Sequence, residues 1–95
     1  MKHTNIPEIM TSDDDRKAIG FWLMLGVVRV RVYATFEYLG ELNPKLAPGS
    51  GGAADVRFNW DRVVADAHRR WRTDGHDRHS DLYEGCPVVI LRAGE

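Results

Sequence analysis

A chain of 95 residues, of which 43 % are hydrophobic and 28 % charged, has the composition of one globular domain and is too apolar for a disordered segment. A formal net charge of −1 excludes the proteins whose overall field attracts nucleic acid or anionic membranes. The only cysteine, Cys86, excludes an intramolecular disulfide, and no apolar stretch approaches the roughly 20 residues of a membrane span. Because no signal-peptide pattern opens the chain, we expect a cytoplasmic protein that does not bind membranes.

The first residues differ in character from the rest of the chain. Residues 1–15 are polar, include the acidic run at residues 13–15 and show no hydrophobic period. We expect them to form an N-terminal arm that lies against the domain. Residues 16–95 are expected to form a single α+β domain.

Residues 17–34 alternate between two kinds of side chain, as in a β-hairpin. A two-residue turn at residues 25–26, where glycine tolerates a positive φ, would pair Phe21 with Val30. In this register one side of the hairpin is wholly apolar. A slip by one residue would mix the two kinds of side chain, so the period supports the pairing.

The other side of the hairpin combines aromatic, methionine and arginine side chains. Its members are Trp22, Met24, Arg29, Arg31 and Tyr33. Trp22 opposite Arg29 would allow a cation–π contact. Such a face is typical of protein interfaces, and it also suits single-stranded nucleic acid, whose bases stack on aromatic rings. The third alternative is that the N-terminal arm covers this face.

Two helices and a closing strand follow. Thr35 is a suitable N-cap for a short helix over residues 36–42, and residues 44–54 read as a flexible loop. Asp55 would cap a longer helix, and residues 87–91 form a short apolar strand. The buried stripe of the longer helix would consist of Val56, Trp60, Val63, Val64, Ala67 and Trp71.

The predicted fold is therefore a two-layer α+β domain of order β-β-α-α-β. Its sheet would be three-stranded and mainly antiparallel, with both helices on one face. A right-handed crossover from the second strand to the third would give the strand order 2-1-3.

These spacings resemble those of a known group of proteins. The shared features are R-x-A-I-x-F at residues 16–21, G-V-V at residues 26–28, Leu39 in the short helix, and Arg62 and Ala67 in the aromatic-led second helix. The chain resembles, over nearly its whole length, the short bacterial proteins of domain of unknown function family 1488. The resemblance implies a small α+β domain of bacterial origin, and it supplies no activity and no functional residues.

A basic stretch ends the longer predicted helix, and it is a candidate anion site. The arginines concerned are Arg69, Arg70, Arg72 and Arg78. Cations at a helix C-terminus also suit the helix dipole, and Asp61 and Asp66 could pair with Arg62 and Arg70 at helical spacing. A solvated, self-neutralising helix end is therefore the alternative that we favour.

Sites for chemistry are weakly indicated. His76 and His79 lie three residues apart without a CxxC or HExxH context, so we expect no metal site and no cofactor. Cys86 before a proline is typical of a small buried residue, so we expect no catalytic residue. The sequence favours a non-enzymatic interaction module that forms a homodimer or binds a protein partner. A nucleic-acid-binding regulator is the alternative, and a metal- or thiol-dependent enzyme is a weaker one.

Overall fold

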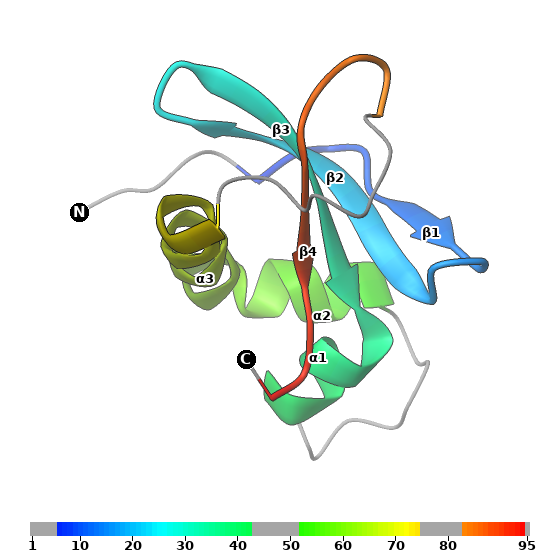
Figure 1. The fold of residues 1–95 in the computed structure, drawn as a ribbon. Helices are drawn as coiled ribbons and strands as arrows, with labels where there is room; N and C mark the ends of the chain where they lie inside the picture. Colours follow the sequence, from blue (N-terminus) through cyan, green and yellow to red (C-terminus); the bar gives the residue numbers. More distant parts are fainter. Residues whose placement is uncertain (1–5, 43–51, 75–82, 95) are drawn as a thin grey trace.

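Seven elements make up the parts of the chain that the structure describes (Figure 1). The computed structural model describes residues 6–42, 52–74 and 83–94. In chain order the elements are β1 (Thr11–Asp13), β2 (Ala18–Leu25), β3 (Val28–Thr35), α1 (Phe36–Leu42), α2 (Gly52–Phe58), α3 (Trp60–Asp74) and β4 (Val88–Leu91). The predicted α+β class is confirmed. The predicted number of strands and helices is wrong, because these residues contain four strands and three helices.

The hairpin of β2 and β3 forms as the alternation predicts, but in a different register. Gly26, at a φ of +68°, opens a turn at residues 26–27, one residue later than predicted. Phe21 consequently pairs with Val32, and not with Val30. Because the displacement is two residues, every side chain stays on its predicted face.

The predicted strand order 2-1-3 is wrong. The observed order is β1-β2-β3-β4, with β4 parallel to β3. The edge of β2 that the prediction assigned to the last strand is taken by β1, whose Thr11 pairs with Gly20. Residues 11–13 lie in the predicted N-terminal arm and carry no apolar period, so side-chain patterning does not reveal them. Strand pairing uses the backbone, which any sequence supplies.

The helices follow the prediction at α1 and depart from it afterwards. Thr35 caps α1, because its Oγ1 accepts a hydrogen bond from the Tyr38 amide at 3.2 Å. The longer helix is divided at Asn59, whose Nδ2 donates to the Asp55 carbonyl at 3.1 Å. Asp55 lies inside α2 and is not a cap, since α2 begins at Gly52. None of the described helices is both long and apolar enough to cross a membrane.

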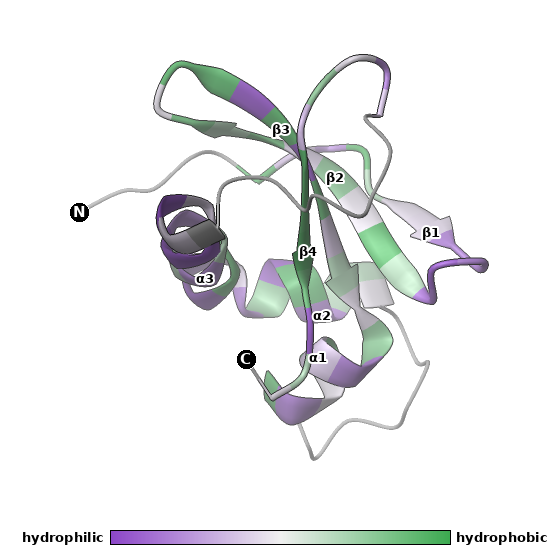
Figure 2. Ribbon diagram, in the orientation of Figure 1, coloured by the Kyte–Doolittle hydropathy of each residue, from purple (hydrophilic) through white to green (hydrophobic). Residues whose placement is uncertain are grey.

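The core lies between one face of the sheet and the helices. Alternate residues of β2, β3 and β4 meet the predicted helical stripe there, and β4 has the hydrophobic colour in Figure 2. Phe21 of β2 packs on Trp60 of α3 with ring centroids 5.4 Å apart. Trp71 is half-buried at the margin of the core. The other face of the sheet is therefore available to the second set of side chains.

Two glycine substitutions test this packing. In Gly20→Ala the new Cβ would lie 2.8 Å from both Arg31 Nη2 and Tyr33 Cε1 on the outer face. We expect the free energy of unfolding, measured by urea titration, to fall by about 1–3 kcal/mol. Gly40 in α1 has nothing within 4 Å, so Gly40→Ala should raise this free energy by about 0.5–1 kcal/mol. A Gly20→Ala protein as stable as the wild type would contradict the packing described.

Candidate interaction face and arginine pocket

The sheet face away from the helices carries every predicted interface residue. Trp22 and Met24 come from β2, and Arg29, Arg31 and Tyr33 come from β3. In the observed register Trp22 pairs with Arg31, and Met24 pairs with Arg29. The face thus alternates apolar and cationic groups across two strands.

Trp22 is the centre of the cationic contacts on this face. The Arg29 guanidinium lies 3.8 Å from the centroid of the Trp22 ring, and the Arg31 guanidinium lies 5.3 Å from it. The predicted cation–π contact between Arg29 and Trp22 therefore forms, although the two residues are diagonal neighbours in the sheet. Such contacts contribute about 0.5–1 kcal/mol when exposed and about 2 kcal/mol when desolvated.

Tyr83, which sequence reasoning did not single out, covers part of this face. Its ring makes edge contacts with Trp22 at 5.4 Å and with Tyr33 at 6.3 Å. Arg16 stacks on the Tyr33 ring at 4.6 Å. Tyr33 and Arg31 are consequently only 2 % and 5 % exposed. This half of the face is closed, and its described covering residues are Tyr83 and Arg16.

Arg31 is a buried cation held by rings. Its guanidinium lies 4.5 Å from the Tyr83 centroid and 5.4 Å from the Tyr33 centroid. Its Nε is buried without a hydrogen-bond partner among the described residues. An unmet donor costs about 1–3 kcal/mol, which the attraction to three rings offsets in part.

The far end of the hairpin remains accessible. Met24 is 46 % exposed and Val27 is 93 % exposed, while Arg29 is exposed and Trp22 half-buried. Within the described residues, β1 pairs only with residues 18–20 and β4 only with residues 31–34. The hairpin therefore extends beyond both neighbouring strands (Figure 1). Its end has an apolar tip, a cation and strand edges that no described strand occupies.

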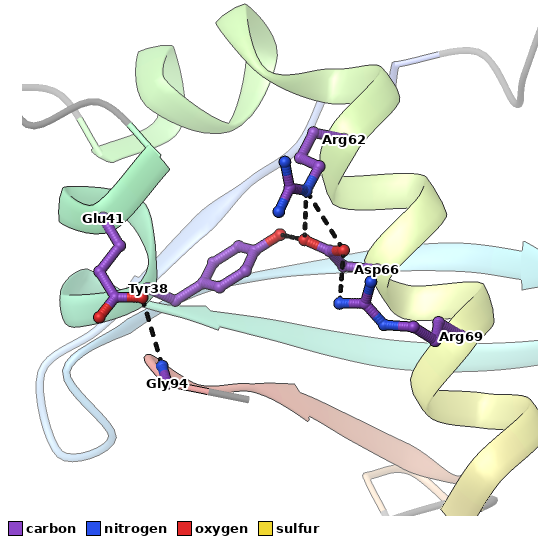
Figure 3. Close-up of polar contacts among 6 residues, drawn as sticks. All are labelled: Tyr38, Glu41, Arg62, Asp66, Arg69 and Gly94. Atoms are coloured by element: carbon purple, nitrogen blue, oxygen red, sulfur yellow. Dashed lines mark hydrogen bonds and ion pairs between the residues drawn. The ribbon is translucent and has the colours of Figure 1, made fainter.

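A second group of polar side chains joins α1 to α3 on the helical side (Figure 3). The Tyr38 hydroxyl donates to Asp66 Oδ2 at 2.5 Å. Arg62 Nε donates to the same oxygen at 3.2 Å, and Arg69 Nη2 donates to Asp66 Oδ1 at 2.8 Å. Asp66 is only 4 % exposed, so its charge is neutralised at close range. Burial, and then the hydrogen bond to Asp66, raise the pKa of the Tyr38 hydroxyl far above its ordinary value.

Tyr38, Asp66 and Arg69 of this group form one wall of a pocket of about 170 Å³ between α3 and the end of β4. The pocket is lined by Tyr38, Asp66, Arg69, Arg70, Thr73, Leu91 and Arg92. Two of the four predicted anion-site arginines, Arg69 and Arg70, thus meet here. Arg72 is exposed and does not line the pocket, and Arg78 lies outside the described residues. Arg92 was missed because only the parallel pairing of β4 brings it beside α3.

The residues considered for metal or thiol chemistry do not gather within the described parts of the chain. His76 and His79 lie outside the described residues. Cys86 is half-buried, and its thiol forms no disulfide. Its backbone exchanges two hydrogen bonds with the backbone of Tyr83, at 2.9 and 3.1 Å. Among residues 6–42, 52–74 and 83–94, no three His, Cys, Asp or Glu side chains are placed to hold a metal ion.

A pH-dependent measurement tests the contact between Tyr38 and Asp66. Tyr38→Phe should lower the free energy of unfolding at neutral pH by about 1.5–3 kcal/mol, the contribution of a hydrogen bond to a charged group. Because folding raises the Tyr38 pKa, the folded protein retains the proton that the unfolded chain releases above about pH 10. Above about pH 10, the free energy of unfolding of the wild type should therefore fall by about 1.4 kcal/mol per pH unit relative to that of Tyr38→Phe. A stability difference unchanged between neutral pH and the alkaline range would contradict the contact.

No family model, curated protein or solved structure matches the chain. The resemblance to domain of unknown function family 1488 is therefore neither supported nor contradicted by these comparisons.

Proposed function

We propose that this chain is a non-enzymatic interaction module that binds an extended, acidic segment of a protein partner at the end of its β2–β3 hairpin. The observation that carries the proposal is the accessible pair of Trp22 and Arg29, stacked at 3.8 Å beside unpaired strand edges. The single cysteine suits a reducing compartment, and we place the protein in the bacterial cytoplasm.

The strand edges favour an extended partner. Beyond residues 18–20 and 31–34, the backbone groups along the outer edges of the hairpin have no strand partner in the described structure. Such edges bind extended peptides by adding a strand, with the main chain contributing affinity and alternate side chains contributing specificity. Trp22, Met24 and Arg29 lie on one face and would meet alternate side chains of the added strand.

The local charge favours an acidic partner. Residues 18–36 contain two arginines and no aspartate or glutamate, although the whole chain has a net charge of −1. One of these arginines, Arg29, is exposed at the hairpin end. A carboxylate beside Arg29 would gain a charge-assisted hydrogen bond while the guanidinium kept its contact with Trp22.

The ring arrangement favours a protein over a nucleic acid. Base stacking needs an open ring face, but Tyr33 is 2 % exposed and Arg29 occupies a face of Trp22. Protein interfaces are instead enriched in half-buried tryptophan, methionine and arginine. A nucleic-acid-binding regulator is therefore the secondary proposal, and an enzyme built on Cys86 has less support than either.

Binding of two designed peptides tests the proposal. One alternates glutamate with valine and threonine, and the other carries lysine at the glutamate positions. Fluorescence anisotropy should show binding of the acidic peptide only, weakening as salt is added. Arg29→Glu and Trp22→Ala should each weaken this binding by about tenfold or more.

The matched control is Arg72→Glu, which makes the same charge change at an exposed position of α3. It should leave the affinity for the acidic peptide within about twofold of the wild type, since long-range screening removes its effect. Equal losses in Arg29→Glu and Arg72→Glu, or binding of neither peptide, would contradict the proposal. Salt-dependent binding of a random single-stranded oligonucleotide that Arg29→Ala abolishes would favour the regulator instead.

Light scattering at two protein concentrations identifies the source of the segment. A molar mass equal to that of one chain at both concentrations agrees with a segment that comes from a separate partner. A mass that doubles, and that Trp22→Ala returns to one chain, would instead assign the hairpin end to self-association. The exposed Asp14 and Asp15 would then be available as its acidic groups.

A further inference from the structure

The pocket beside Asp66 has the charge of an anion site. Three of its lining side chains are arginines, at Arg69, Arg70 and Arg92, and one is the carboxylate of Asp66, so its formal charge is +2 (three minus one). Thr73 adds a hydroxyl to the lining. This pocket lies on the helical side of the sheet and is independent of the hairpin surface proposed above.

Asp66 orients the cationic wall of the pocket. The carboxylate is 4 % exposed and is itself held by the Tyr38 hydroxyl at 2.5 Å and by Arg62 at 3.2 Å. It accepts one hydrogen bond from Arg69 Nη2 at 2.8 Å, which leaves the other N–H groups of that guanidinium for a ligand. Because Asp66 already holds the Arg69 side chain in one orientation, a ligand that binds to it causes little further loss of side-chain entropy.

We propose that this pocket binds a phosphoryl group. A volume of about 170 Å³ is well below the roughly 300–1,000 Å³ of sites for drug-sized ligands, so the pocket fits a small anion or one end of a larger molecule. Phosphate carries up to two negative charges near neutral pH, which suit a pocket lined by three arginines. Its tetrahedral oxygens accept hydrogen bonds from several arginines and a hydroxyl at once, whereas a planar carboxylate offers two oxygens.

Titration of the full chain with inorganic phosphate, followed by amide NMR shifts at constant ionic strength, tests the proposal. Saturable shifts should appear at Arg69, Thr73 and Arg92. A small phosphate monoester, glycerol 2-phosphate, is titrated in parallel. Tighter binding of the monoester would indicate the end of a larger ligand, and equal binding would indicate the free anion. Both results support a phosphoryl site.

Single substitutions separate the pocket from general cationic attraction. Arg92→Gln and Arg70→Gln should each weaken phosphate binding by about tenfold or more, because each removes a charged donor from the lining. Arg72→Gln is the matched control, since it removes the same charge from an exposed position of α3 outside the pocket lining, and it should change the affinity by less than about twofold. Thermal unfolding of each variant confirms that it is folded, and two pocket variants keep the test informative if one is not.

Two results would overturn the proposal. The first is the absence of saturable shifts up to about 10 mM phosphate, which corresponds to an affinity too weak for a specific site. The second is an equal loss of binding in Arg72→Gln and Arg92→Gln. The hairpin variant Arg29→Glu should leave phosphate binding unchanged, so failure at one surface is distinguishable from failure at the other.

Discussion

The pairing of β2 with β3 divides the side chains of this small protein into two sets. Each strand alternates strictly, so the hairpin places its apolar residues toward the helices and its arginines and aromatic rings on the opposite face. A slip of one residue would place Arg29 and Arg31 on the same face as Phe21 and Leu23. The core and the proposed interaction surface therefore depend on the same hydrogen-bond register.

Two of the buried charges among the described residues, Asp66 and Arg31, are compensated in different ways. Asp66 is surrounded by the Tyr38 hydroxyl and two guanidinium groups, which supply conventional donors to a carboxylate. Arg31 lies among the rings of Trp22, Tyr33 and Tyr83, and its Nε has no acceptor in the described parts of the chain. The first arrangement ties α1 to α3 and suits a fixed pocket. The second holds Arg31 with aromatic rings, which leave the charge of the hairpin cationic.

Much of this organisation follows from local pattern. The faces of the hairpin, the Thr35 cap of α1 and the stripe that includes Trp60 and Val63 were predictable, because each depends on residues close in sequence. The division of the long helix had a local signal in Asn59, a residue whose side chain competes for backbone hydrogen bonds. The apolar stripe continues past Asn59 without interruption, and this stronger pattern predicts one continuous helix.

The remaining features depend on residues that meet only in three dimensions. Strand β1 is polar and three residues long, so its backbone pairing left no trace in hydrophobicity. Because β1 occupies the edge of β2, β4 pairs with the other edge of the hairpin, at β3. Parallel pairing there places Arg92 beside Arg69, and the turn before β4 brings Tyr83 over the outer face. The spacing of residues along the sequence therefore could not predict the arginine pocket or the closed half of the outer face.

The hairpin places the Arg29 guanidinium over the Trp22 ring, and ring-current shifts in proton NMR measure this contact directly. Protons above an indole face resonate upfield, and the Arg29 guanidinium lies 3.8 Å from the ring centroid. We predict upfield shifts for the Arg29 Nε and δ-methylene protons that disappear in Trp22→Ala. Random-coil shifts for these protons in the wild-type protein would contradict this contact and the surface built on it.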